Sequence, residues 1–157
     1  MTTPDLTENE RNETPLERAD RNLMELLGGL RVALPGVQVL FAFLLVVPFN
    51  ERFDDVTSFQ KNVYFATLLC TAVASTFLIA PSVHHRRLFR QQAKEELVVT
   101  ANRLALVGLA FLAPAIIGVL VLVTDFLFGS LETILVAGLA AGLMLVIWFV
   151  LPLRLRG

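Results

Sequence analysis

Three residues stand out as candidates for transport chemistry, because each interrupts a long apolar stretch or ends one. Gln38 carries an amide inside the first stretch, and Pro114 lies in the middle of the third. Pro114 leaves the carbonyl of Ala110 without its helical donor, and some transporters expose backbone carbonyls to cations through such breaks. Asp125 follows the third stretch beside an apolar turn, where a partly desolvated carboxylate could serve a proton-coupled transporter. Each also has a structural interpretation: Gln38 as a hydrogen-bonded link between helices, Pro114 as an ordinary kink, and Asp125 as a solvated span end.

Further candidates lie where the apolar stretches meet charged segments. Arg31 precedes the first stretch, and we expect its guanidinium to reach lipid phosphate, with a substrate gate as the alternative. His84 and His85 follow the second stretch and stand directly before two arginines. Because adjacent side chains diverge by about 100° on a helix, the pair predicts a charged interfacial cluster rather than a metal site. A pH sensor is the alternative interpretation of the two histidines.

Small residues at four-residue spacing mark candidate faces for helix packing. The second stretch carries a stripe of hydroxyl residues, Thr67, Thr71 and Ser75, and an adjacent stripe of Ala66, Cys70 and Ala74. The fourth stretch carries Gly138 and Gly142 in a GxxxG pattern. We expect these faces to pack within the chain, and dimerisation is the alternative for the glycine pair. We expect no redox or metal role for Cys70, because no second cysteine or nearby histidine accompanies it.

These residues belong to four uncharged stretches of membrane-spanning length, at 32–49, 63–83, 104–124 and 133–153. None of their positions holds Asp, Glu, Lys, Arg or His. A hydrocarbon core of about 30 Å needs roughly 20 apolar residues in a helix, which satisfies its own backbone. The chain has 157 residues and is 55% hydrophobic and only 17% charged, which is too apolar for a small soluble domain. We therefore predict an all-α integral membrane protein, with a four-helix transmembrane bundle over residues 31–153.

The segment before the first stretch divides into two parts. Residues 1–14 are polar, and we expect them to form a disordered tail. Residues 15–30 begin with proline, and their leucines recur at helical spacing opposite charged residues. This pattern predicts an amphipathic helix in the cytoplasmic interface, turning into the first span at Gly28 and Gly29, with a partner-docking surface as the alternative. Residues 154–157 form a short tail at the other end of the chain.

Lys and Arg are distributed unequally between the two ends of the predicted spans. Eleven of the 13 lie in the N-terminal segment, the connection at 84–103 and the C-terminal tail, and only Arg52 and Lys61 lie on the other side. Because cytoplasmic segments carry the excess of positive residues, we expect both termini in the cytoplasm, with the protein in a bacterial inner membrane. The connection at 84–103 favours helix, so we expect the second and third spans to extend into the cytoplasm.

Several segments of the chain resemble a family of small bacterial four-span membrane proteins. They are Glu25–Phe53, Ala80–Pro81, His84–Arg90 and Asn102–Leu106, and the resemblance covers nearly all of the chain after residue 20. The family is one of unknown function, and automated labels within it include sodium:proton antiporter. The resemblance therefore implies the four-span fold, with cation-coupled proton transport as an activity to consider.

Charge and motif content exclude several classes of function. A net charge of −1 provides no basic excess for nucleic acid, and one cysteine excludes an intrachain disulfide. The sequence contains no His-Glu-x-x-His motif, no glycine-rich phosphate loop and no nucleophile elbow. We therefore expect no catalytic residues, metal or cofactor. We predict a non-enzymatic membrane protein that packs with itself or with a larger membrane partner. The alternative is a small oligomeric ion- or proton-coupled transporter.

Overall fold

The computed structural model describes residues 15–88 and 94–154, and four long helices dominate this part of the chain. They are α1 (Pro15–Val46), α2 (Ser58–Leu88), α3 (Lys94–Leu127) and α4 (Ser130–Leu145). The predicted tail at 1–14 lies outside the described residues, and so does the predicted C-terminal tail except for Arg154, which ends α5. Two 3₁₀ turns, Val47–Phe49 and Glu51–Asp55, connect α1 to α2. A π-helical turn, Val146–Val150, continues α4 into the short helix α5 (Leu151–Arg154).

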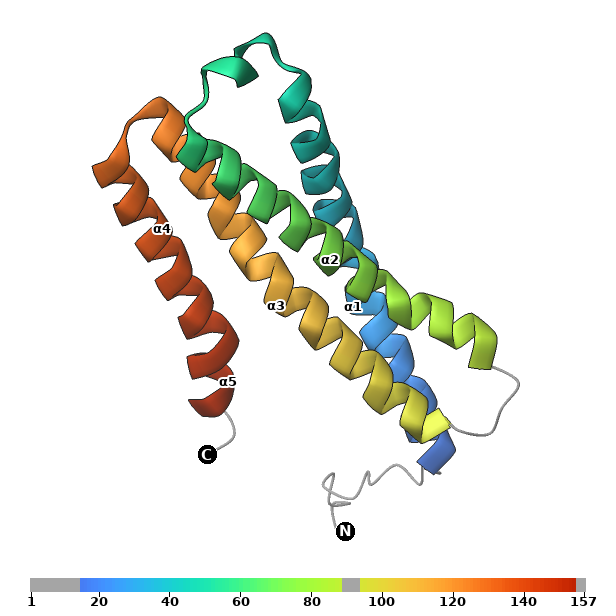
Figure 1. The fold of residues 1–157 in the computed structure, drawn as a ribbon. Helices are drawn as coiled ribbons and strands as arrows, with labels where there is room; N and C mark the ends of the chain where they lie inside the picture. The colour runs from blue at the N-terminus through green and yellow to red at the C-terminus, as the bar shows by residue number, and fades with distance from the viewer. Residues whose placement is uncertain (1–14, 89–93, 155–157) are drawn as a thin grey trace, which may run out of the picture.

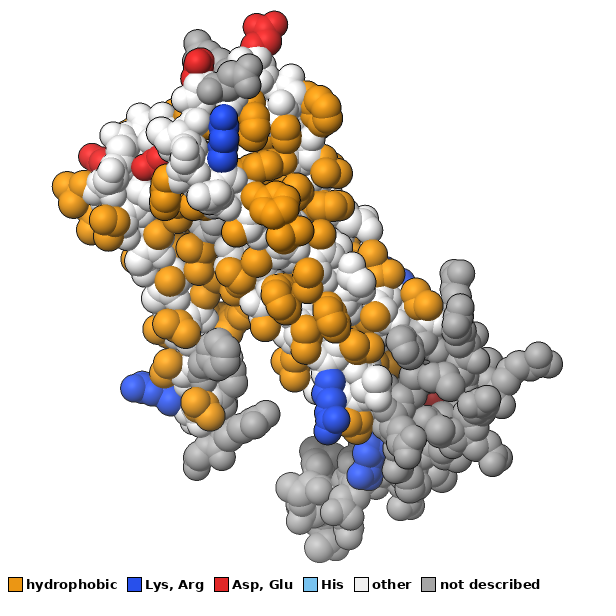
Figure 2. All heavy atoms as spheres, viewed as in Figure 1, with side chains coloured by type: hydrophobic (Ala, Val, Ile, Leu, Met, Phe, Trp, Pro, Cys, Tyr) orange, Lys and Arg blue, Asp and Glu red, His pale blue; other side chains and the backbone are white. Residues whose placement is uncertain are grey.

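All four long helices are apolar enough and long enough to cross a membrane, which confirms the predicted all-α membrane fold. The spanning segments are Asp20–Phe49, Ser58–Val83, Val98–Leu127 and Ser130–Trp148. α3 has 34 residues and is therefore about 51 Å long, so it extends well beyond a hydrocarbon core of about 30 Å. Figure 2 shows hydrophobic side chains over the middle of the molecule and the coloured charged side chains toward its ends.

The described chain begins and finishes at the same end of the molecule, which we call the termini end (Figure 1). The opposite end, the loop end, holds the α1–α2 connection and the tight turn between α3 and α4. Gly129 makes this turn possible with a φ of 123°, a backbone conformation that favours glycine because a side chain would clash there.

The most extensive contact between helices joins α2 to α3, and two glycines of α3 allow it. A Cβ atom added at Gly108 would lie 2.7 Å from Cγ of Leu78, and one added at Gly118 would overlap the Oγ1 atom of Thr67. The backbone of α3 therefore approaches α2 more closely than larger residues would permit. α1 completes the core from another side, with Leu30 and Val37 packed against Leu78 and Ala105.

The N-terminal segment does not form the separate interfacial helix that its leucine spacing predicts. α1 runs without interruption from Pro15 to Val46, and Gly28 and Gly29 are helical positions within it. Leu23 is only 5% exposed, because it packs in a cluster with Leu26, Leu27, Val98 and Ala101. The apolar stripe is thus covered by protein rather than left for the lipid interface, because α3 extends equally far toward the termini end.

α4 is attached to the rest of the molecule on one side only. Within the described residues it contacts α3, but neither α1 nor α2. Figure 1 shows α4 beside α3 at the loop end and diverging from it toward the termini end. Thr133, near the loop end, is the one buried residue of α4. The chain therefore folds as a three-helix core of α1, α2 and α3, with the fourth helix attached to α3.

Candidate functional site at the loop end

A hydrogen-bonded link between Gln60 and Asp125 joins α2 to α3 at the loop end. Nε2 of Gln60 donates to Oδ2 of Asp125 across 2.8 Å, and Asp125 is half-buried. The same glutamine caps α2: its Oε1 accepts from the backbone N–H of Thr57, and its own N–H donates to Oγ1 of Thr57. This reciprocal pair is a capping box, which satisfies backbone donors at a helix start. The cap uses the side-chain oxygen and the backbone N–H of Gln60 and holds the side chain in place, so that its Nε2 group is free to donate to Asp125.

A second polar contact joins α2 to the end of α1. Pro48 has no amide hydrogen, so it cannot bond the carbonyl of Leu44 four residues earlier. The hydroxyl of Tyr64 supplies the missing donor across 2.9 Å. The Tyr64 ring also meets Phe53 edge to face, with centroids 5.5 Å apart, and Nζ of Lys61 lies 5.9 Å from the centroid of the Phe53 ring. These contacts fix the α1–α2 connection over the ends of the helices.

A half-open cavity of about 520 Å³ lies among these elements. α1 contributes Phe43 and Leu44 to its wall, and α3 contributes Val123, Phe126 and Leu127. Its polar lining consists of Asn50, Gln60 and Tyr64, beside Phe53 and Val56 of the connection. The volume lies within the range of about 300–1,000 Å³ that small-molecule sites occupy. The cavity is therefore large enough for an apolar ligand.

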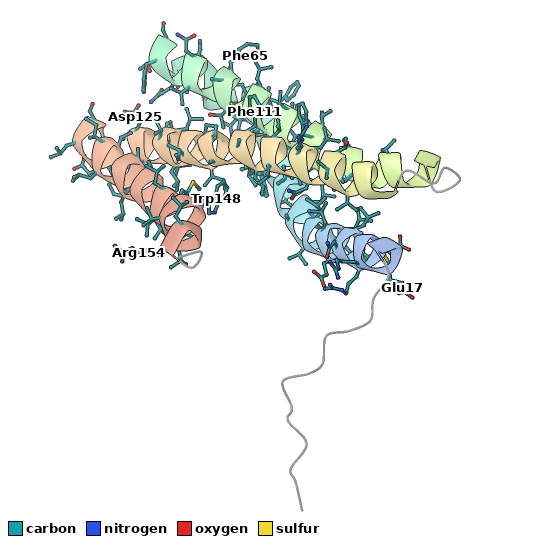
Figure 3. The ribbon with its side chains drawn as sticks, turned by 90° about the horizontal axis from the view of Figure 1, so that it is seen from below. Glu17, Phe65, Phe111, Asp125, Trp148 and Arg154 are labelled. Carbon is teal, nitrogen blue, oxygen red and sulfur yellow. The ribbon has the colours of Figure 1, made fainter. Side chains whose placement is uncertain are left out.

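The structure does not bring the predicted transport residues together into one site. Asp125 lies at the loop end, near the turn from α3 to α4 (Figure 3), in the link with Gln60, whereas Gln38 is exposed on α1 and Pro114 is exposed on α3. Arg31 is also exposed, near the middle of α1. Pro114 lies inside an unbroken α3. Of the predicted transport residues whose side chains the structure describes, Asp125 is therefore the one whose polar contact lies beside the cavity.

The exposed Gln38 has no hydrogen-bond partner among the described residues. It lies in the spanning segment Asp20–Phe49. Within the described chain, Gln38 therefore does not form the hydrogen-bonded link between helices that was one interpretation of it.

His84 and His85 lie in the last turns of α2, and their side chains are outside the described part of the structure. Among the side chains that are described, no group of three or more His, Cys, Asp or Glu residues gathers in a way that could hold a metal ion.

The predicted packing residues fall into two groups. Ala74 is completely buried in the core, whereas Cys70 is half-buried and Ala66 is exposed. A Cβ atom added at Gly138 or Gly142 would meet nothing within 4 Å, so the GxxxG face of α4 has no neighbour within the described chain. The small-residue pattern thus correctly marks a buried position on α2 but marks an uncovered face on α4.

The buried face of α2 is the stripe of hydroxyl residues that the sequence also marks, Thr67, Thr71 and Ser75. The threonine hydroxyls donate to carbonyls one turn earlier, from Thr67 to Val63 and from Thr71 to Thr67. Oγ of Ser75 is buried without a hydrogen-bond partner among the described residues. The stripe therefore packs against α3 with most of its polarity satisfied inside its own helix.

The contacts of four residues were not predicted from the sequence: Gln60, Tyr64, Gly108 and Gly118. The pattern Thr57-Ser-Phe-Gln60 is a capping-box signature that could have marked the start of α2. Pro48 could have marked the unpaired carbonyl of Leu44. No local pattern identifies Gly108 and Gly118 as contact positions, because other glycines of the chain meet nothing.

These features define a multi-span helical membrane protein with a polar link and an apolar cavity at one end. A family model described as "Family of unknown function (DUF6328)" matches residues 12–152, and the chain belongs to this family. Comparisons with curated proteins and with solved structures find no match.

Proposed function

We propose that the protein is a non-enzymatic membrane protein that associates with a second copy of itself through the face of α1 that carries Gln38. The observation that carries this proposal is the exposed Gln38 amide, which has no hydrogen-bond partner in the described chain although it lies in an uncharged apolar stretch. An amide without a partner is costly in hydrocarbon. A hydrogen bond to a neighbouring helix lowers this cost by about 0.6–2 kcal/mol.

The chemistry of an amide supports a second copy as the partner. A glutamine side chain has both a donor group and an acceptor oxygen, so two of them can satisfy each other. Copies inserted with the same orientation and related by a twofold axis along the membrane normal place α1 beside α1 at equal depth. Gln38 of one copy then lies level with Gln38 of the other.

The residues around Gln38 are compatible with a helix contact. Pro35, Ala42 and Leu45 are exposed and lie within about 60° of Gln38 around the α1 axis, and so does Arg31, two turns before Gln38. Ala42, one turn from Gln38, is small enough to let a second helix approach closely. The uncovered GxxxG face of α4 provides a second surface on which further contacts can form.

We propose that the protein lies in the inner membrane of a bacterial cell and that both of its termini face the cytoplasm. The unequal distribution of Lys and Arg supports this orientation, because eleven of the 13 lie in the N-terminal segment, the connection at 84–103 and the C-terminal tail. Arg154 and Arg31 would then lie near the phosphates of the cytoplasmic leaflet, and Lys61 near those of the other leaflet.

Self-association is tested with purified full-length protein in mild detergent, by energy transfer between copies labelled at the N-terminus. Gln38→Leu should weaken association about threefold to thirtyfold, the equivalent of one interhelical hydrogen bond. Gln38→Asn keeps an amide and should lose less. Val39→Leu is the matched control, because it places the same side chain about 100° around the helix, and it should leave association unchanged.

Cross-linking identifies the face directly. In a Cys70→Ala background, Gln38→Cys should form a disulfide-linked dimer in oxidised membranes more readily than Val39→Cys. A wild-type protein that stays monomeric at all detergent-to-protein ratios contradicts the proposal. Equal cross-linking at both positions contradicts the role of the Gln38 face.

A further inference from the structure

The cavity at the loop end has an apolar interior whose polar lining groups are already engaged. The amide of Gln60 bonds Asp125 and Thr57, and the hydroxyl of Tyr64 bonds the carbonyl of Leu44. The rest of the wall is aliphatic or aromatic apart from Asn50. A cavity of this kind offers water few partners and favours an apolar occupant.

The position of the cavity determines which apolar molecule can reach it. Its walls come from the last turns of the α1 and α3 spans, and Val123 and Leu127 are 52% and 62% exposed. The cavity is half-open, so its wall is continuous with the outer surface of the spans. In a bilayer that surface faces lipid chains, which lie at the same depth as the opening.

Charged residues neighbour the lining residues on the side of the connection. Lys61 lies over Phe53, while Glu51 and Asp55 are exposed and adjoin the lining residues Asn50 and Val56. Asp125 adds a further carboxylate beside Phe126. The connection also contains Arg52, so basic and acidic residues are mixed at this end of the protein. A headgroup that carries both a phosphate and an ammonium matches this mixture. A headgroup with a phosphate alone matches it less well.

We propose that the cavity binds one acyl chain of a zwitterionic aminophospholipid, with the phosphate of the lipid near Lys61 and its ammonium near Glu51 and Asp55. The lipid would cover the apolar wall between α1 and α3 and brace the α1–α2 connection. This role is separate from self-association, because Gln38 does not line the cavity.

The test uses full-length protein reconstituted in vesicles of equal parts dioleoyl phosphatidylethanolamine and dioleoyl phosphatidylglycerol, then extracted into mild detergent. Native mass spectrometry counts the lipids that remain bound. We expect about one phosphatidylethanolamine per chain, retained at least fivefold over phosphatidylglycerol. Val123→Trp should reduce its retention at least fivefold by filling the cavity. Val107→Trp is the matched control on an exposed part of α3 outside the cavity, and it should have no effect.

The headgroup contacts are tested separately with Glu51→Gln and Asp55→Asn combined, which should reduce the preference for phosphatidylethanolamine at least threefold. If Val123→Trp has a lower thermal midpoint of unfolding than Val107→Trp, Leu127→Trp is used in place of Val123→Trp, because it fills the cavity from another position. Equal retention of both lipids, retention of neither, or equal losses in the cavity variant and the control each overturn the proposal.

Discussion

Glycines lie both in the contact between α2 and α3 and on the free face of α4, but another helix covers them only in the contact. On α3, Gly108 and Gly118 lie so close to Leu78 and Thr67 that a Cβ atom could not be added without a shift. On α4, a Cβ atom added at Gly138 or Gly142 would meet nothing within 4 Å. Small residues thus permit a close helix contact, but a facing helix must be present for the contact to form. The glycines of α4 are consequently available to another molecule.

The two regions also differ in the number of hydrogen bonds that their polar side chains make. On the α2 side of the contact, the Thr67 and Thr71 hydroxyls bond their own helix, and the Gln60–Asp125 link closes the loop end. α4 has one comparable bond, from the Thr133 hydroxyl to the carbonyl of Gly129 across 2.6 Å. The α2–α3 contact is therefore specified by several interactions, whereas α4 is held near one end.

Substitution of Gly118 by valine should have the largest effect on folding. The added side chain would overlap Thr67, so either α2 and α3 separate or both shift, and overpacking of this kind costs about 1–3 kcal/mol. Gly138→Val on α4 makes the same change where nothing lies within 4 Å, and it should leave the stability nearly unchanged. Thermal unfolding of both variants in detergent, followed by circular dichroism, measures the difference. Equal losses of stability in the two variants would contradict the difference in packing between the α2–α3 contact and the face of α4.

Breaking the link at the loop end should have an intermediate effect. Asp125→Leu removes the acceptor of the Gln60 amide and should lower the free energy of unfolding by about 1 kcal/mol, because the carboxylate is only half-buried. Asp125→Asn keeps an acceptor oxygen and should lose less than half as much. Denaturant titration of the two variants gives these values. A loss as large for Asn as for Leu would show that the charge, rather than the hydrogen bond, matters.

The smallest effects should come from single hydroxyls inside the α2–α3 contact, and they should have opposite signs. Thr71→Val removes a bonded hydroxyl and should destabilise by about 0.5–1 kcal/mol. Ser75→Ala removes a buried oxygen without a described partner, so it should be neutral or stabilise by up to about 1 kcal/mol. The same denaturant titration distinguishes them. Destabilisation by Ser75→Ala would mean that the hydroxyl has a partner in the folded protein.

The existence of four spans could be predicted from the sequence, but the ends of the spans and the role of the N-terminal segment could not. Both ends of each apolar stretch are marked by charged residues, and the helices extend those stretches at one or both ends. The leucine stripe of residues 15–30 correctly indicates a helix with one apolar face. Leu23 packs against Ala101 because α3 begins before the predicted stretch at 104–124, and no local pattern in residues 15–30 reveals that partner.

For the candidate site, the sequence identified Asp125 but not the residues around it. Gln60 lies 65 positions earlier, and its capping role explains why its amide is held where Asp125 can accept from it. The cavity wall combines residues from α1, the connection, α2 and α3. Such a site depends on how the helix ends meet, and spacing within any one segment carries no information about that.

The amino-acid sequence by itself determined that this protein is a helical membrane protein with four spans, because hydrophobicity and internal backbone bonding are properties of each segment alone. Only the tertiary structure decided which polar and small residues are covered. Gln38 and Gly138 face away from the described chain, whereas Thr67 and Gly118 face each other. The physical reason is that lipid covers an apolar helix face as readily as another helix does, so pairing depends on how closely the backbones fit.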